Sequence, residues 1–275
     1  MRGSVPVPSR RMLRYGGNTA CVEVTLSDGT EIILDAGTGI RVLGAARTSD
    51  AERVQVLLTH LHLDHIQGLL FFPPLFDPSK AITVYGPPAP GPNLDQRLAR
   101  YLSAPLAPVD LHELPAQVEF AACPQEEWTV GSARIRAAIV AHRGVTVGYR
   151  ITEGDTSLCY LPDHEPALGA VLTEAEPGWI SGMRLAGGAS LVIHDGQYDD
   201  QGYAAHVGWG HSSISDALTF ARRAEVERMV LFHHDPTHDD RDLDRLAEVA
   251  RREWELAGRD PDTVSLAAEG VTVDL

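Results

Sequence analysis

The sequence predicts an α/β fold in which strands pack as face-to-face layers with helices outside them. Two observations support this prediction: short β-rich runs alternate with amphipathic helical segments along the 275 residues, and many of the runs end in His or Asp. Hydrophobic residues make up 44% of the chain and charged residues 22%, which is typical of globular proteins. No segment has the composition of a linker, so residues 1–275 are expected to form a single domain.

The predicted strands share β-branched and apolar residues, and turn-forming or polar residues bound them. They span residues 20–26, 31–35, 53–59, 81–85, 133–141, 145–152, 157–161, 189–193, 228–232, 263–267 and 271–275. A Ser-Asp-Gly turn joins the first two strands. We expect 133–141 and 145–152 to pair as a hairpin, and the last two strands to close the fold as another.

Capping signals and apolar spacing predict the helices. Asn93 and Gln96 resemble a capping box, and apolar residues follow them at helical spacing. Ser213 and Asp216 give a similar signal for a second helix. The longest helix is predicted over 240–257, where apolar residues form one stripe and a glycine follows the last turn.

The composition excludes several classes of protein. The chain has 23 basic and 38 acidic residues, a formal charge of −15, which argues against a large basic surface for nucleic acid. A small anionic substrate is still compatible, because a metal site can be locally positive. The three cysteines form no C-x-x-C pair, so neither a disulfide framework nor a thiolate zinc site is expected. No signal peptide or membrane-length apolar run is evident, and a cytoplasmic protein is expected.

The strongest local signal is His60-x-His62-x-Asp64-His65, which follows the predicted strand 53–59. In an extended turn, His60 and His62 can point the same way, and Asp64 and His65 can then face a second ion. Imidazole and carboxylate groups favour zinc, with manganese or iron as alternatives. A histidine-rich surface loop is the disfavoured alternative. Three further candidates follow distant strands: His142, Asp163 and His233.

The complete H-x-H-x-D-H motif at 60–65 resembles that of the metallo-β-lactamase fold superfamily, within it the ribonuclease Z and cyclic phosphodiesterase branch. The resemblance begins at residues 15–19 and 34–37 and extends to the last histidine motif. It implies a four-layered αββα sandwich with a dinuclear site at its rim, and a homodimer. It also implies the ligands: His60, His62 and His142 for one metal, Asp64, His65 and His233 for the other, and Asp163 bridging both.

Two further motifs resemble those of this branch. Gly210-His211-Ser212-Ser213 is similar to its H-S-T motif, and the segment that begins at His194-Asp195 is similar to a diverged H-E-A-T motif. The resemblance implies that His211, held by Asp195, protonates the leaving oxygen. The alternative for His211 is a helix-terminal residue oriented by packing. Asp35 is expected to brace the metal loop without binding metal.

The expected activity is hydrolysis of a small phosphodiester, such as a cyclic nucleotide or a ribose cyclic phosphate. A hydroxide that bridges the two metals is the expected nucleophile, which Asp64 could orient. The proline-rich segment 86–115, an expected excursion over one edge, contains only Arg97 and Arg100 as cations, so nucleic acid is a less favoured substrate. Three alternatives stay open: an ester, thioester, lactone or β-lactam hydrolase, a ribonuclease Z-like endonuclease, and a non-catalytic nucleotide-binding module.

The sequence leaves open which residues face the substrate. Five candidates lie near the expected rim: Arg14, His164, His206, His234 and Asp235. Arg14, with the arginines at positions 10 and 11, could form a small basic lip for one phosphate, or the segment could simply be solvated. The apolar residues 71–76 are a candidate dimer surface, or alternatively a packed loop.

Overall fold

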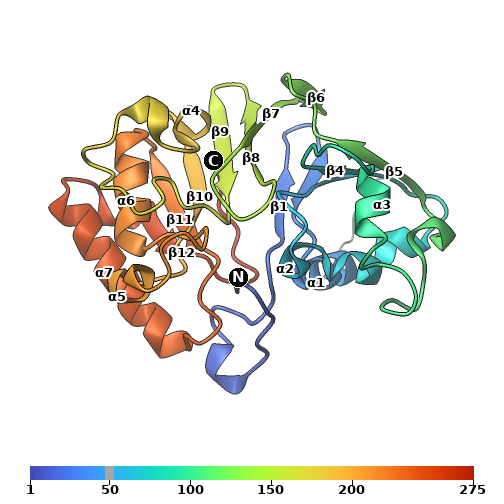
Figure 1. The fold of residues 1–275 in the computed structure, drawn as a ribbon, viewed down its shortest axis with the longest axis horizontal. Helices are drawn as coiled ribbons and strands as arrows, with labels where there is room; N and C mark the ends of the chain where they lie inside the picture. The colour runs from blue at the N-terminus through green and yellow to red at the C-terminus, as the bar shows by residue number, and fades with distance from the viewer. Residues whose placement is uncertain (47–52) are drawn as a thin grey trace.

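The computed structural model describes residues 1–46 and 53–275. It contains two β-sheets that form adjacent layers, with an apolar cluster between them (Figure 1). The five-stranded sheet has the order β1 (Val22–Thr25), β2 (Glu31–Leu34), β3 (Arg53–Leu57), β4 (Ala81–Gly86) and β5 (Gln117–Ala122). The seven-stranded sheet has the order β12 (Val264–Leu266), β11 (Arg228–Phe232), β10 (Leu191–Asp195), β9 (Thr156–Leu161), β8 (Val147–Glu153), β7 (Ala133–Ile139) and β6 (Trp128–Val130).

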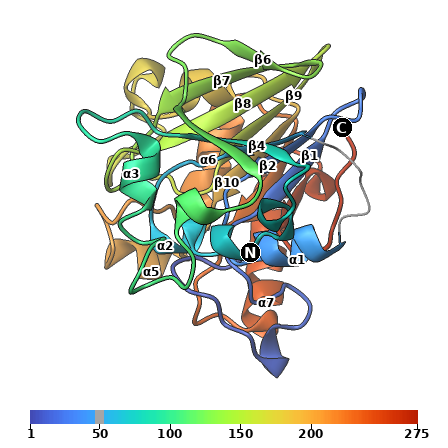
Figure 2. The same ribbon diagram turned by 90° about the vertical axis from the view of Figure 1, so that its right-hand side faces the viewer.

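Helices cover the outer side of each sheet, which gives the predicted αββα layers (Figures 1 and 2). The five-stranded sheet has α1 (Gly39–Ala46), α2 (Leu63–Ile66) and α3 (Leu94–Leu98) on its side. The seven-stranded sheet has α4 (Met183–Ala186), α5 (Asp200–Ala204), α6 (Ile214–Arg223) and α7 (Asp240–Leu256). Short 3-10 helices are η1 (Arg10–Met12), η2 (Leu69–Phe71), η3 (Pro73–Phe76), η4 (Leu111–Glu113), η5 (Pro177–Trp179) and η6 (Pro261–Thr263).

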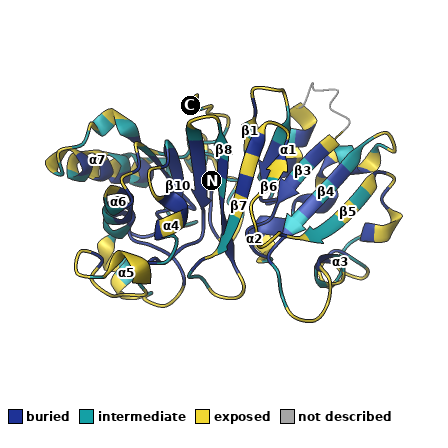
Figure 3. Cartoon of the chain, turned by 90° about the horizontal axis from the view of Figure 1, so that it is seen from above, coloured by how far each residue is buried: buried dark blue, intermediate teal, exposed yellow. Residues whose placement is uncertain are grey.

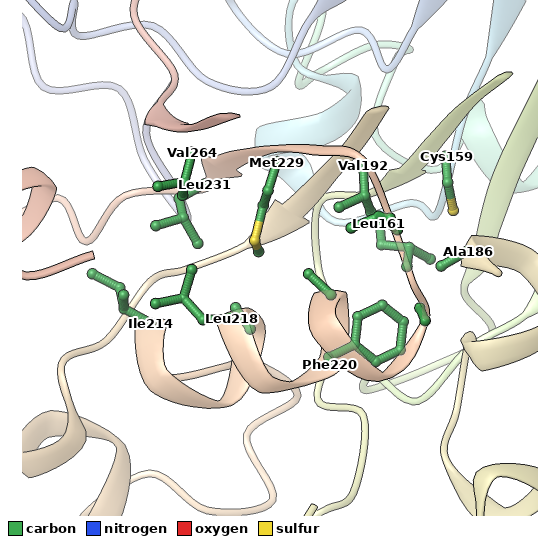
Figure 4. Packing of buried hydrophobic residues seen from close by; sticks show 14 of the residues in the cluster. Cys159, Leu161, Ala186, Val192, Ile214, Leu218, Phe220, Met229, Leu231 and Val264 are labelled. Carbon is green, nitrogen blue, oxygen red and sulfur yellow. The ribbon is translucent and has the colours of Figure 1, made fainter. Parts of the chain in front are cut away.

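The apolar interior has three parts, one between the sheets and one beneath each helical layer. Leu34 from the first sheet and Tyr149 and Phe232 from the second belong to the central cluster. In the second part, Leu218 and Phe220 of α6 pack toward the strands of the seven-stranded sheet (Figure 4). Figure 3 shows β10 buried along its length, whereas the outer surface of α5 is exposed.

Local signals predicted the hairpin and the helix caps correctly. Strands β7 and β8 are antiparallel, and a capping box precedes α3. The Ser213 hydroxyl accepts a hydrogen bond of 3.0 Å from the Asp216 backbone N–H at the start of α6. Gly258, which follows α7, has a φ of +78°, the left-handed conformation that ends helices.

The predicted closing hairpin is wrong. Strand β12 pairs in parallel with β11, and residues 271–275 form no strand. The long helix α7 connects β11 to β12, and such a crossover is the connection that parallel neighbours require. Strands β5 and β6 were not predicted. The proline-rich segment 86–115 contains α3 and η4 and leads into β5, the edge strand.

None of the helices within residues 1–46 and 53–275 combines the length and the apolar character needed to cross a lipid bilayer.

Candidate metal centre

The ligand-type residues lie in the turns that follow several strands. The segment after β3 passes through His60 and His62 into the short helix α2, whose residues include Asp64 and His65. Three other turns supply the remaining candidates: His142 after β7, Asp163 after β9 and His233 after β11. Because these turns meet beside α2, residues from both sheets converge at one place.

The first group contains His60, His62, His142 and Asp163. Each offers one ligand atom, and these atoms all lie within 4.8 Å of one another. Asp163 Oδ2 is 3.7 Å from His60 Nε2 and 3.6 Å from His142 Nε2. His62 Nδ1 is 3.2 Å from His142 Nε2. This is the set that the resemblance implied for one metal.

The second group contains Asp64, His65, His233 and again Asp163, within the same 4.8 Å limit. Asp163 Oδ1 lies 3.0 Å from His65 Nε2, and Asp163 Oδ2 lies 3.3 Å from His233 Nε2. Asp64 Oδ2 is 3.2 Å from His233 Nε2. Asp163 therefore belongs to both groups, the position implied for a bridging carboxylate.

The donor set fits a divalent cation. In the described part of the chain, His60 Nε2, His65 Nε2 and Asp163 Oδ1 are buried and make no hydrogen bond of acceptable geometry, although the last two lie 3.0 Å apart. Buried polar atoms without partners are costly, and a cation that accepts their lone pairs would remove this cost.

The protonation states of three of the ligand residues, His60, His142 and Asp163, suit metal binding. Burial, reinforced by nearby His65, lowers the pKa of His60 well below its ordinary value. Burial likewise lowers the pKa of His142 to about 4. Burial opposes ionisation of Asp163, but the charges of His233 and His65 hold the pKa of that carboxyl well below its usual range. Neutral imidazoles and an ionised carboxylate are the forms that coordinate metals. Burial disfavours a charged His65, but the carboxylates of Asp163, Asp64 and Asp35 raise its pKa well above the ordinary value, so a metal would displace a proton there.

Hydrogen bonds at the far side of the rings orient four of the histidines. His65 Nδ1 donates to Asp35 Oδ2 (2.8 Å), and His142 Nδ1 donates to the Gly210 carbonyl (2.7 Å). His233 Nδ1 lies 2.8 Å from Gln197 Oε1, and His60 Nδ1 lies 3.0 Å from the hydroxyl of Thr59. Each Nδ1 is thereby occupied, which leaves Nε2 to face the centre.

Asp35 braces the metal loop, as predicted. It is fully buried and accepts hydrogen bonds from the Thr59 backbone N–H (2.7 Å) and the Tyr160 hydroxyl (3.0 Å), besides His65. Its carboxylate therefore connects β2, the loop after β3 and α2 with β9 of the other sheet.

His211 and Asp195 form a tight pair beside both ligand groups. His211 Nδ1 lies 2.6 Å from Asp195 Oδ2, and Asp195 also accepts hydrogen bonds from the backbone N–H groups of Gln197 and Ser212. Burial disfavours a charged imidazole, but Asp195 overcomes this effect and raises the pKa of His211 to about 9. The His211 ring lies 5.0 Å from that of His142 and 4.8 Å from that of His233, measured between centroids. A protonated imidazole therefore lies next to the ligands.

Three of the five candidates for substrate contact have other partners. His164 is buried, with Nδ1 2.9 Å from His194 Nε2. His234 is also buried and donates to the Ala267 carbonyl. Arg14 forms an ion pair with Asp244 on α7, so its guanidinium already has a carboxylate partner within the protein. Asp235 accepts a hydrogen bond from the Thr237 backbone N–H and is partly exposed. His206 stacks on the Tyr198 ring and donates a hydrogen bond to the Gly202 carbonyl (2.7 Å).

Two further contacts were missed by sequence reasoning. The Ser4 backbone N–H donates a 2.8 Å hydrogen bond to Asp64 Oδ2, which brings the segment near the N-terminus against the centre. The buried Glu165 carboxylate accepts from the backbone N–H groups of Gly208 (2.8 Å) and Gly210 (2.7 Å) and from the Tyr203 hydroxyl. Neither contact has a local sequence signal, because each joins segments far apart in the chain.

Comparisons with known proteins support the assignment of the family. The sequence pattern of the beta-lactamase superfamily domain matches residues 30–234. A protein named ribonuclease Z from Mycobacterium sp. (strain KMS) is 29% identical over 258 residues, and the match covers 84% of this chain and 81% of that protein.

Two solved structures share the fold. The metallo-beta-lactamase fold protein YhfI from Bacillus subtilis has a TM-score of 0.68 and 18% identity, over 98% of this chain and 94% of that one. The short form of human tRNase Z has a TM-score of 0.65 and 20% identity, over 99% of this chain and 96% of that one.

The matched pattern contains the 60–65 motif and ends one residue beyond His233. It thus includes all of the ligand-type residues, together with strands β2 to β11 of the two sheets. The chain therefore belongs to the metallo-β-lactamase fold superfamily and is a metal-dependent hydrolase.

Proposed function

We propose that this protein is a phosphodiesterase that acts on a small diester, such as a cyclic nucleotide or a ribose cyclic phosphate, with two divalent ions. The observation that carries the proposal is the shared carboxylate of Asp163 between two histidine-rich groups, with the His211–Asp195 pair alongside. The imidazole and carboxylate donors favour zinc, and manganese or iron are alternatives.

The ligand residues would hold the ions as two sets that share Asp163: His60, His62 and His142 in one, Asp64, His65 and His233 in the other. When bound, such ions activate water near neutral pH and neutralise charge on phosphoryl oxygens. Asp64 would also orient the attacking water.

The proposed general acid is His211. Asp195 holds its Nδ1, so the transferable proton is the one on Nε2, and the same carboxylate keeps the ring charged. Proton donation from Nε2 to the departing oxygen would stabilise an alkoxide leaving group. An acid beside the metals therefore suits a phosphodiester, whose departing group is an alkoxide.

A second candidate is RNA cleavage, favoured by the similarity to proteins named ribonuclease Z. The charge of −15 opposes binding of a long polyanion, since attraction by the metals decays within about 10 Å at ordinary ionic strength. The ion pair of Arg14 with Asp244 reduces the positive charge that Arg14 offers to a polyanion. These features favour the small substrate.

We further propose a cytoplasmic homodimer. The cysteines in the described residues are all free, as is usual in a reducing compartment.

Within the apolar stretch 71–76, Phe72 and Leu75 are buried in the core, whereas Phe71 and Phe76 are 57% and 46% exposed. These two rings are the proposed contact with a second copy.

The test compares wild-type protein with His211→Ala. We expect the variant to retain its metals by elemental analysis but to lose a factor of about 10²–10⁴ in turnover, the usual contribution of a general acid. The substrate panel contains bis-p-nitrophenyl phosphate, cyclic nucleotides, a precursor tRNA, a lactone and nitrocefin. Wild-type turnover confined to the lactone or nitrocefin would contradict the phosphodiesterase proposal, and turnover confined to the tRNA would favour the second candidate. Stoichiometric metal without turnover on any of them would indicate a non-catalytic module.

A further inference from the structure

We propose that Trp209, Arg143 and His206, named here the Trp209 platform, bind a nucleobase attached to the scissile phosphodiester. This inference rests on the proposed function and narrows its substrate to nucleotides. None of the three residues is needed for the ligand sets or for the acid.

The platform is a row of stacked and edge-to-face rings that ends in a guanidinium group. His206 stacks on Tyr198, with ring centroids 4.7 Å apart and planes 11° apart. Trp209 meets His206 edge to face at 4.8 Å. The Arg143 guanidinium carbon lies 5.7 Å from the Trp209 ring centroid. Trp209 thus has neighbours that orient it, yet 53% of the residue is exposed and available to a ligand.

Backbone contacts connect the platform directly to the metal centre. Arg143 follows the ligand residue His142, and Trp209 lies two residues before His211. The carbonyl of Gly210, next to Trp209, accepts the hydrogen bond from His142 Nδ1. A group bound on the platform would therefore lie beside the scissile phosphate and the acid.

The platform is also held rigidly. The buried carboxylate of Glu165 binds the backbone N–H groups on both sides of Trp209, those of Gly208 and Gly210. The Arg143 Nε donates to the Gly208 carbonyl (3.2 Å), which ties the loop after β7 to the loop before α6. A binding surface fixed in this way loses little conformational entropy when a ligand arrives.

The chemistry of the platform matches a nucleobase. A half-exposed indole gives a flat apolar surface, and base–aromatic stacking contributes to binding whatever the base. In residues 1–46 and 53–275, Arg143 forms no ion pair with a carboxylate, so its charge is available to a nucleotide. An aromatic ring together with arginine is a combination that recurs where proteins bind unpaired bases.

The test measures the preference between two matched substrates: adenosine 2′,3′-cyclic phosphate and the 2′,3′-cyclic phosphate of methyl riboside, which lacks the base. The preference is the ratio of their kcat/KM values. We expect wild-type holoenzyme to prefer the adenosine substrate, and Trp209→Ala to reduce this preference about tenfold, mainly through KM. Trp209→Phe, which keeps a ring, should retain most of it. The control is Trp179→Ala, which removes an indole that is 86% exposed and lies on η5; this variant should keep the wild-type preference.

A binding measurement makes the test independent of turnover. Titration of the holoenzyme with adenosine 3′-monophosphate should give binding about tenfold weaker in Trp209→Ala than in wild type. If both substrates are hydrolysed without a preference, or if Trp209→Ala weakens both equally, the platform has no role in base binding and the inference is overturned. The phosphodiesterase proposal would then still stand. If no diester is hydrolysed, that proposal fails, and the titration alone decides whether the platform binds a base.

Discussion

The carboxylate of Asp163 is expected to affect metal binding at both ligand groups, because it lies close to histidines of each, 3.0 Å from His65 Nε2 and 3.6 Å from His142 Nε2. We predict that Asp163→Asn reduces the metal content per chain below that of wild-type protein, since the neutral amide removes the charge shared by both ligand groups. Elemental analysis after dialysis measures the content. The matched control is Asp155→Asn, in the exposed turn between β8 and β9, which should keep the wild-type value. Full occupancy in the Asp163 variant would argue against a bridging role.

The reactivity of the three cysteine thiols depends on pH, because only the ionised thiol reacts. Burial raises the pKa of Cys123 to about 11 and that of Cys159 to about 12, and it also raises the pKa of Cys21. Only the thiolate reacts with alkylating agents, so iodoacetamide should label none of them rapidly in folded protein at about pH 8. In urea, where the thiol pKa returns to about 8.5, all three should react. Mass spectrometry counts the labels, and rapid labelling of folded Cys159 would contradict its burial.

Helix α7 shows how one element stabilises its layer. Its buried residues include Leu243, Leu246 and Trp254, and Trp254 has no exposed surface. The Trp254 Nε1 donates a 2.9 Å hydrogen bond to the Thr263 hydroxyl, which ties the helix to η6. Trp254→Ala should reduce the free energy of unfolding by about 3–5 kcal/mol, from lost apolar burial and the cavity left behind.

Urea denaturation of the metal-loaded proteins measures this difference. The exposed Trp179 serves as the matched control, and Trp179→Ala should change stability by about 0.5 kcal/mol or less. If Trp254→Ala lowers the free energy of unfolding as little as Trp179→Ala does, the packing of Trp254 in α7 contributes little to stability.

Elements with strong local signals were the ones the sequence predicted well. The caps at Asn93 and Ser213 and the hairpin of β7 and β8 depend on residues close together in the chain, and all were correct. The partner predicted for β12 was wrong. Its pairing with β11 depends on the path of α7 and not on the residues of the strand itself. Edge strand β5 follows a proline-rich segment that obscured its start.

The candidate site also combines a motif with a local sequence signal and residues that come together only in the folded chain. The 60–65 motif is local and was evident from spacing alone. The grouping of His142, Asp163 and His233 came from the family resemblance, since their separation in sequence gives no contact information. The Trp209 platform could not be predicted, because Arg143, Trp209 and the supporting carboxylate of Glu165 lie far apart in the sequence.

At the scale of the whole molecule, the metal centre joins the two sheets. The loop after β3 belongs to the five-stranded sheet, whereas Asp163 and His233 follow strands of the seven-stranded sheet. The central apolar cluster also draws on both, with Leu34 from one sheet and Tyr149 from the other. We therefore propose that residues 1–275 behave as one domain that unfolds in a single cooperative step.

Metal removal tests this proposal. Ions that bind only the folded state stabilise it by RT ln(1 + [L]/Kd), about 4 kcal/mol when free metal exceeds Kd a thousandfold. Treatment with a chelator should lower the Tm of wild-type protein, and circular dichroism and tryptophan fluorescence should report the same single shifted transition. Asp163→Asn, with fewer ions to lose, should shift less. If the chelator moves one of two separate transitions and leaves the other in place, the sheets unfold independently, and the single-domain proposal is wrong.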